Sequence, residues 1–219
     1  MNVLESQQAY RLWAPTYATE TAVSFLDEEL AVALSPAPDG RRLLDAGCGT
    51  GRRLAKNKAA LAIGVDLNLD MLLAGAVDCV AAADLRLLPF RSSPFDVVWC
   101  RLVLGHFVDP LPAYRELARV CRPEGFLFVS DFHADAVAAG HRRTFRDQQG
   151  TLCEVEHHVH DVDSHVRMAA RAGFVVTAQH DGHVGPSVKA FYAAAGHDAA
   201  YERDRGLALV AAFLFQRTA

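Results

Sequence analysis

The sequence of 219 residues predicts an α/β fold, in which helices cover both faces of a mostly parallel sheet. Short apolar runs rich in β-branched and aromatic residues alternate with stretches whose apolar residues recur every three or four positions. The runs are apolar throughout, as expected of strands that are buried on both faces. The composition, 51% hydrophobic and 22% charged, is typical of a globular protein, and we expect one domain over 1–219.

Five buried strands are expected in the first two thirds of the chain. They are RRLLDAG (41–47), LAIGVDL (61–67), CVAAADL (79–85), FDVVWCRL (95–102) and GFLFVSDF (125–132). Between the last two strands, LPAYRELARVCR (111–122) has the apolar spacing of one helical face. Pro123 and Gly125 are expected to end this helix.

The tail is expected to form a strand, a helix and a strand over 150–180. The helix over 162–172 should end at Gly173, because glycine suits the left-handed conformation of a C-cap. LALVAAFLFQRTA (207–219) is a long apolar strand. It follows another strand after a short helical excursion, so we expect it to insert antiparallel into the sheet.

A glycine-rich turn follows the first strand, where LLDAGCGTGR (43–52) contains Gly47, Gly49 and Gly51. Glycines at this edge of a parallel sheet let the backbone adopt positive φ and approach a ligand, and a helix starting there offers N–H donors. A dinucleotide site would favour G-x-G-x-x-G, whereas this turn is D-x-G-x-G-x-G. Asp45 would repel a pyrophosphate but would suit a cationic amino or sulfonium group.

Two further acids follow the next two strands. Asp66 ends the second strand, where an acid accepts the hydroxyls of a ribose in nucleotide-binding folds. Asp84 ends the third strand, where its side chain can reach the amine of an adenine. Three acids at the ends of consecutive strands indicate a pocket for an adenosine that lacks phosphates.

These segments, with FDVVWCRLVLGHFVDP and YRELARVCRPEGFLFVSDFH, resemble the class I S-adenosylmethionine-dependent methyltransferases. The resemblance is to the small-molecule branch that includes type 11 methyltransferase domains, quinone C-methyltransferases and malonyl carrier-protein O-methyltransferases. It implies a Rossmann-like sheet of seven strands, mostly parallel, with an antiparallel C-terminal strand. It also implies methyl transfer from S-adenosyl-L-methionine to an oxygen, nitrogen or carbon of a small molecule by in-line displacement, leaving S-adenosyl-L-homocysteine.

The resemblance implies a role for each residue of the pocket. Asp45, Gly47 and Gly51 would frame the methionine portion, with Gly49 allowing close approach, and Asp66 would hold the ribose. The other implied cofactor contacts are Leu67 and Met71 beside the adenine, Asp84 and Leu85 at its edge, and Arg101 at the methionine end. Residues 1–35 resemble a helical lid, whose candidates for closing the site against water are Tyr10, Trp13 and Tyr17.

Histidines are the candidates for a general base, which is needed only when the nucleophile must lose a proton. His106 and His133 follow the fourth and fifth strands, in loops that open onto the carboxyl edge of the sheet. If EVEHHVH (154–160) is a strand, His158 and His160 share one face with two glutamates, as a metal site or a polar pocket wall. We expect substrate contact and no metal there, with His157 a hydrogen-bonded core residue on the opposite face.

The densest basic cluster, HRRTFR, lies in a segment over 133–165 that we expect on the substrate side. On a helix, Arg142 and Arg143 would lie one turn before Arg146. We expect Arg143 and Arg146 to orient an anionic acceptor. The alternative is that the cluster is a solvated surface.

Composition and motifs argue against several other functions. A net charge of -4, and CRLVLG rather than Asn/Asp-Pro-Pro-Tyr after the fourth strand, argue against nucleic acid. The five scattered cysteines, the absence of a cationic start before an apolar core, and apolar runs shorter than about 18 residues predict a soluble cytoplasmic protein without a membrane partner. The alternatives are a cofactor-binding protein without transfer activity and a nicotinamide-dependent oxidoreductase. The sequence does not predict the oligomeric state.

Overall fold

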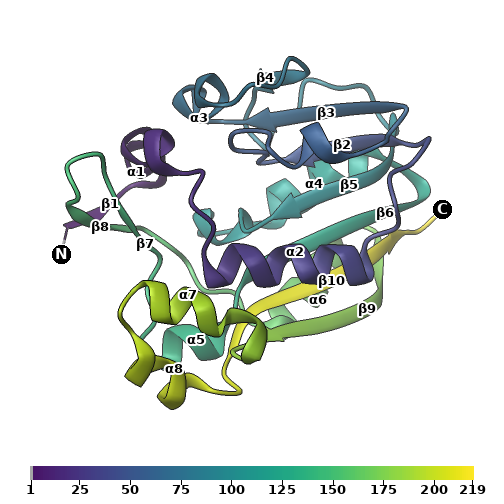
Figure 1. Ribbon diagram of the computed structural model, residues 1–219. Coiled ribbons are helices and arrows are strands. Elements are labelled where there is room, and N and C mark those ends of the chain that lie inside the picture. Colours follow the sequence, from purple (N-terminus) through teal and green to yellow (C-terminus); the bar gives the residue numbers. More distant parts are fainter. Residues whose placement is uncertain (1) are drawn as a thin grey trace.

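The computed structural model describes residues 2–219, without the side chain of Lys56. Its main sheet has seven strands in the order β4-β3-β2-β5-β6-β10-β9 (Figure 1). Each pair of neighbours among β4, β3, β2, β5 and β6 is parallel, and β10 runs antiparallel to both of its neighbours, β6 and β9. The predicted seven-stranded sheet with an antiparallel C-terminal strand is confirmed. The strands are β2 (Arg42–Ala46), β3 (Leu61–Asp66), β4 (Val80–Ala82), β5 (Phe95–Arg101), β6 (Cys121–Phe132), β9 (Phe174–His183) and β10 (Ala208–Arg217).

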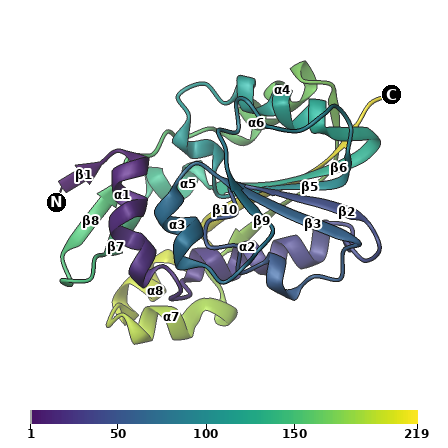
Figure 2. The same ribbon diagram turned by 90° about the horizontal axis from the view of Figure 1, so that it is seen from above.

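Helices cover both faces of this sheet (Figure 2). On one face lie α4 (Leu111–Val120) and α6 (Val162–Arg171), and on the other lies α2 (Ala22–Leu34). Neighbouring residues of a strand point to opposite faces, so Leu44 packs in the same cluster as Tyr114 of α4, whereas Leu43 packs in the cluster that contains Leu26 of α2. Both faces are therefore buried, which explains why the strands are apolar throughout.

A second, smaller sheet joins the start of the chain to the segment after β6. Its strands are β1 (Asn2–Leu4), β8 (Leu152–Val155) and β7 (Thr144–Arg146), in the order β1-β8-β7. Strand β1 pairs in parallel with β8, with Val3 opposite Glu154. This sheet was not predicted from the sequence. It places α1 (Ser6–Trp13) and the short helix η1 (Ala14–Thr16) beside the segment that was expected to contact substrate.

The helical excursion before the last strand consists of η4 (Pro186–Val188), α7 (Lys189–Ala194) and α8 (Asp198–Asp204). Helices α7 and α8 contact each other and lie together at the lower left of Figure 1. Tyr201 of α8 is buried with Ala136 of α5 (Ala134–Ala138), so the excursion packs against the loop region after β6.

Several predicted boundaries were wrong. No α-helix begins at the glycine turn, because only η2 (Leu54–Lys56) fits before β3, and α3 (Leu69–Ala74) is the next helix. Helix α4 ends at Val120, and Pro123 and Gly125 lie within β6, where a register shift opposite β5 accommodates them.

The segment after β6 also differs from its prediction. Residues 141–143 have no regular structure and Arg146 ends β7, so the three arginines do not share a helix. Strand β8 ends at Val155, and the expected strand over 154–160 is therefore wrong beyond that residue. The pairing with β1 ends with the hydrogen bond that the N–H of Glu156 donates to the Leu4 carbonyl at 2.8 Å. Within the part of the chain that the structure describes, no helix is both long and apolar enough to cross a bilayer.

Candidate functional site

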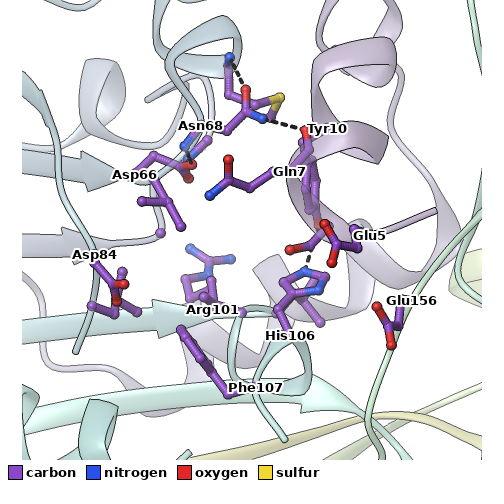
Figure 3. A pocket seen from close by; sticks show the side chains of 18 of the residues that line it. Glu5, Gln7, Tyr10, Asp66, Asn68, Asp84, Arg101, His106, Phe107 and Glu156 are labelled. Atoms are coloured by element: carbon purple, nitrogen blue, oxygen red, sulfur yellow. Dashed lines mark hydrogen bonds between the residues drawn. The ribbon is translucent and has the colours of Figure 1, made fainter.

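A cleft of about 470 Å³ opens at the carboxyl ends of β2, β3 and β5 (Figure 3). Helix α1 and residues from the segment after β6 form its other wall. The cleft brings together most of the residues that were predicted to bind cofactor: Tyr17, Gly47, Gly49, Asp66, Leu67, Met71, Asp84, Leu85 and Arg101. Lining residues that sequence reasoning missed include Gln7, Asn68, Leu102, Phe107 and Glu156.

At two positions of the glycine turn, a side chain larger than the hydrogen of glycine would lie too close to neighbouring side chains. Gly47 and Gly49 adopt φ values of 85° and 58°, which favour glycine. A Cβ atom at Gly47 would collide with the side chain of Val103. One at Gly49 would lie 3.1 Å from the Met71 methyl carbon and 3.7 Å from the Tyr17 ring. The turn therefore leaves space in the cleft that only glycine preserves.

Asp66 is held in place by the backbone around it. Its two carboxylate oxygens accept hydrogen bonds from the backbone N–H of Gly49 and of Asn68, each at 2.8 Å. Burial raises the pKa of Asp66. A carboxylate has about four lone-pair sites, so Asp66 retains acceptor capacity for hydroxyls of a ligand.

Asn68 ties the N-terminal segment to the sheet. Its side-chain oxygen accepts a hydrogen bond from the N–H of Met71 at 3.0 Å and so caps α3, while its amide donates to the Gln7 carbonyl at 2.9 Å. Figure 3 shows Asn68 between Asp66 and the α1 wall. Helix α1 is thus fixed over the Asp66 side of the cleft.

Asp84 lies at the far end of the cleft, on the side of Asp66 (Figure 3). It pairs with Arg86 at 2.6 Å, and hydrogen bonds from Arg86 lower the pKa of Asp84. The Arg86 guanidinium in turn lies 5.6 Å from the centre of the Phe107 ring. Asp84 is therefore ionised at neutral pH and can accept a hydrogen bond from a ligand amine.

Arg101 is engaged in a buried ion cluster below the cleft. Its guanidinium donates to Asp27 at 2.8 Å and to Glu28 at 2.7 Å, and Arg53 donates to the same Asp27 oxygen at 2.7 Å. Burial acts to raise the pKa of Asp27, but the two arginine charges and the Ser130 hydroxyl hold it below its usual value. Arg101 lines the cleft, and its predicted contact with the methionine end stays a prediction.

Asp45 and Gly51 do not line the cleft. Asp45 is fully buried, and neither of its oxygens has a hydrogen-bond partner among the described residues. Burial raises the pKa of Asp45 to about 6. A Cβ at Gly51 would lie 3.2 Å from the Val77 side chain. The predicted contacts of both residues with the methionine portion stay predictions.

The two candidate bases lie in different environments. His106 lines the cleft with Nε2 3.0 Å from the Tyr10 hydroxyl (Figure 3), and burial lowers its pKa to about 3, so it is neutral at neutral pH. His133 does not line the cleft. Its Nδ1 accepts a hydrogen bond from the N–H of Asp135 at 3.0 Å, which caps α5.

The basic and histidine-rich residues are likewise separated. Arg143 lines the cleft, whereas Arg146 donates to the Gly150 carbonyl at 2.9 Å and lies outside it. His158 and His160 also lie outside the cleft, and His160 hydrogen-bonds the Phe107 carbonyl at 2.9 Å. In the described residues no group of three His, Cys, Asp or Glu side chains is arranged to hold a metal ion. The predicted substrate contacts of Arg146, His158 and His160 stay predictions.

His157, which was predicted to be a hydrogen-bonded core residue, lies 3.4 Å from the buried Asp131 carboxylate. Its side chain is 7% exposed. This placement agrees with the prediction.

The charges of the cleft favour a cationic ligand. Glu5, Asp66 and Glu156 contribute carboxylates, whereas the charge of Asp84 is balanced by Arg86. Of the arginines that line the cleft, Arg86 and Arg101 are already paired with acids. The acceptors at Asp66 and Asp84, the apolar side chains between them and the open glycine turn fit an adenosine carrying a positive charge better than a pyrophosphate.

Known proteins share both the sequence motifs and the fold. The family model described as a methyltransferase domain matches residues 44–129. Ubiquinone biosynthesis O-methyltransferase of Ralstonia nicotianae is 31% identical over 186 residues, which cover 79% of this chain and 77% of that protein. Malonyl-(acyl-carrier protein) O-methyltransferase of Erwinia billingiae is 28% identical over 136 residues, covering 59% of this chain and 54% of that protein. The chain spans about half the length of several such curated relatives.

Solved structures show the same fold at lower identity. The S-adenosylmethionine dependent methyltransferase from Mesorhizobium loti aligns with a TM-score of 0.65 at 21% identity, over 88% of this chain and 98% of that chain. The (4+2)-cyclase SpnF aligns with a TM-score of 0.67 at 20% identity, over 100% of this chain and 99% of that chain.

Proposed function

Because the chain belongs to the class I S-adenosylmethionine-dependent methyltransferases, we propose that it transfers a methyl group from S-adenosylmethionine to a small-molecule acceptor. The observation that carries the proposal is the cleft itself, in which a glycine turn, two strand-end carboxylates and a lid helix surround one space. When bound there, the cofactor supplies a methyl group that its sulfonium has already activated.

The residues of the cleft divide into those that hold the cofactor and those that cover it. Asp66 accepts hydrogen bonds from the ribose hydroxyls, and Asp84 accepts one from the adenine amine. Leu67, Met71 and Leu85 provide apolar surface for the ring. Tyr17 and the α1 wall cover the site and exclude water, and the Asn68–Gln7 hydrogen bond keeps that wall in position.

The protein itself has little covalent chemistry to perform. Methyl transfer needs the acceptor atom in line with the methyl group, so positioning is the main contribution of the side chains. His106 lines the cleft, neutral and hydrogen-bonded to Tyr10, and its lowered pKa makes it a poor general base at neutral pH. Arg143 is the cleft arginine that we assign to an anionic acceptor.

The acidic balance and the relatives named above support a small molecule rather than nucleic acid as the acceptor. We propose a cytoplasmic location on the use of five free cysteines, which a reducing compartment tolerates. One neighbour of similar fold is named a cyclase, so the fold by itself does not imply transfer.

Calorimetric titration tests the cofactor site. Asp66→Ala should weaken S-adenosylmethionine and S-adenosylhomocysteine binding at least tenfold, about 1.4 kcal/mol, because the charge-assisted hydrogen bonds to the ribose are lost. Asp70→Ala, an exposed acid on α3, should leave affinity unchanged. Unchanged affinity in a folded Asp66→Ala protein would contradict the assignment. Tighter binding of a nicotinamide dinucleotide would favour the oxidoreductase alternative.

A labelled-methyl transfer screen tests the activity. Protein, radiolabelled S-adenosylmethionine and fractionated cell extract should yield a labelled small molecule. Cofactor binding without any labelled product across such a screen would favour the alternative of a cofactor-binding protein without transfer activity.

A further inference from the structure

A second cleft of about 570 Å³ adjoins the cofactor cleft. The two clefts share Tyr17, Leu102 and Arg143 in their linings. Leu102 follows β5 with φ 59°, a left-handed conformation that is uncommon for residues other than glycine and that clusters at functional sites. We propose that the second cleft binds the methyl acceptor, and that this acceptor is an anionic aromatic molecule whose hydroxyl is deprotonated by His141. The inference rests on the proposed function.

The walls of the second cleft suit a flat ring. Trp13 and Tyr17 from the N-terminal segment, Phe132 at the end of β6, and Tyr192 of α7 all line it. Trp13 stacks on Phe145 with ring centres 4.9 Å apart, and Tyr17 packs edge-on against Trp13 at 5.0 Å. Aromatic walls held in this way offer large contact area with little loss of conformational freedom.

The cleft is also rich in positive charge. Its lining contains Arg52, Arg142, Arg143 and Arg203, against a single carboxylate, Asp204. Arg203 is paired with Asp204 at 2.8 Å, and Arg142 donates to the His141 carbonyl at 2.8 Å. Arg143 has a buried guanidinium nitrogen with no hydrogen-bond partner in the part of the chain that the structure describes. A carboxylate on the acceptor would satisfy that donor.

A histidine and an acid meet in the same cleft. His141 Nε2 lies 3.0 Å from Asp204 Oδ2, and the Asp204 side chain is 3% exposed whereas that of His141 is 22% exposed. The pair joins the loop after α5 to the end of α8, and the N–H of His141 donates to the Ala136 carbonyl at 2.9 Å. Among the described residues Nε2 of His141 makes no hydrogen bond, so its contact with Asp204 is one of charge when the ring is protonated, and the neutral ring keeps a lone pair on one nitrogen.

The proposed step balances without another reactant. The neutral ring of His141 takes the hydroxyl proton, and the acceptor oxygen forms a bond to the methyl carbon. The carbon–sulfur bond breaks as the sulfur keeps its electron pair, which gives a methyl ether and S-adenosylhomocysteine. The resulting imidazolium is stabilised by the charge of the Asp204 carboxylate, 3.0 Å away.

Two successive binding experiments, first with S-adenosylhomocysteine and then with acceptor probes, test this inference separately from the proposed function. S-adenosylhomocysteine is first titrated alone, and failure at that step contradicts the proposed function. The protein saturated with S-adenosylhomocysteine is then titrated with 4-hydroxybenzoate and with its uncharged analogue 4-hydroxybenzamide. We expect at least tenfold tighter binding of the benzoate. Absence of binding by the benzoate, or equal affinity for both probes, overturns this inference alone.

Paired variants locate the bound probe. Arg143→Gln should remove the preference for the benzoate, whereas Arg146→Gln, which changes an arginine outside both clefts, should keep it. Ala200→Trp should fill the second cleft and weaken both probes at least tenfold, and Ala199→Trp on the exposed side of α8 should not. S-adenosylhomocysteine affinity should stay unchanged in the two tryptophan variants. Unchanged probe binding in Ala200→Trp overturns the placement.

Steady-state kinetics with 4-hydroxybenzoate as the acceptor test the roles of His141 and Asp204. His141→Gln should lower kcat at least 100-fold with KM within threefold, because it removes the base without emptying the cleft. Asp204→Asn should lower kcat at least tenfold at unchanged KM. If His141→Gln retains the wild-type kcat, the assignment of His141 is wrong.

Discussion

At the scale of single residues, Asp45 shows how burial changes the chemistry of a carboxylate. Its oxygens have no hydrogen-bond partner among the described residues, and burial raises its pKa to about 6. The folded state therefore binds the Asp45 proton more tightly than the unfolded chain, whose pKa is about 3.9. The stability that this gives is fully present below about pH 4 and is lost as the pH rises through about 6.

Asp45→Asn should remove this pH dependence. We expect the free energy of unfolding of the variant, relative to the wild type, to rise by about 1.5 kcal/mol between pH 5 and pH 8. Urea unfolding at the two pH values measures it. Asp39→Asn, at an exposed position, serves as the control and should show no such change. A constant difference between wild type and Asp45→Asn would contradict the raised pKa.

A second residue-scale prediction separates backbone strain from loss of space in the cleft. Gly49→Val should abolish measurable S-adenosylhomocysteine binding, because its Cβ would enter the space between Met71 and Tyr17. Gly140→Val imposes similar strain at φ 95°, but no heavy atom lies within 4 Å of the new Cβ. It should lower stability by about 1 kcal/mol or more and leave binding intact. Calorimetry and thermal unfolding distinguish the two effects, and normal binding by Gly49→Val would place the cofactor elsewhere.

At the scale of elements, local patterns predicted the strands and the site residues at their ends. Asp66 and Asp84 could be placed from sequence because the carboxyl ends of parallel strands meet at one edge. The small sheet could not be predicted, because β1 and β7 have only three residues each and β1 pairs with β8, which is distant from it in sequence. The positions of Arg143 and Arg146 depend on that pairing, which explains why only the first reaches the cleft.

The small sheet and the aromatic stack form one unit over the cofactor cleft. Trp13→Ala removes the stacking on Phe145 and the contact with Tyr17. We expect about tenfold weaker S-adenosylhomocysteine binding and faster amide hydrogen exchange in α1, with a small change in global stability, because this cluster is separate from the two main cores. Leu12→Ala, at an exposed position, is the matched control. Unaltered exchange in α1 would show that the stack does not hold the lid.

At the scale of the whole molecule, the buried Asp27 joins segments that are far apart in sequence. It lies on α2 and accepts hydrogen bonds from Arg53 beside the glycine turn, from Arg101 at the end of β5 and from Ser130 on β6. Helix α2, the glycine turn and the centre of the sheet therefore share one carboxylate. Removing it would leave two buried arginines with the partly exposed Glu28 as their remaining acidic partner.

We therefore expect Asp27→Ala to lower the free energy of unfolding by about 3–5 kcal/mol, the range found when one partner of a buried ion pair is removed. Glu28→Gln changes the neighbouring acid, whose side chain is 53% exposed, and should cost less than about 1 kcal/mol. Urea unfolding followed by tryptophan fluorescence measures both, and Trp99, 5.6 Å from the Arg101 guanidinium, reports on the cluster directly. Equal, small losses in the two variants would mean that Asp27 does not link these segments energetically, and that the apolar clusters on the two faces hold the molecule together without it.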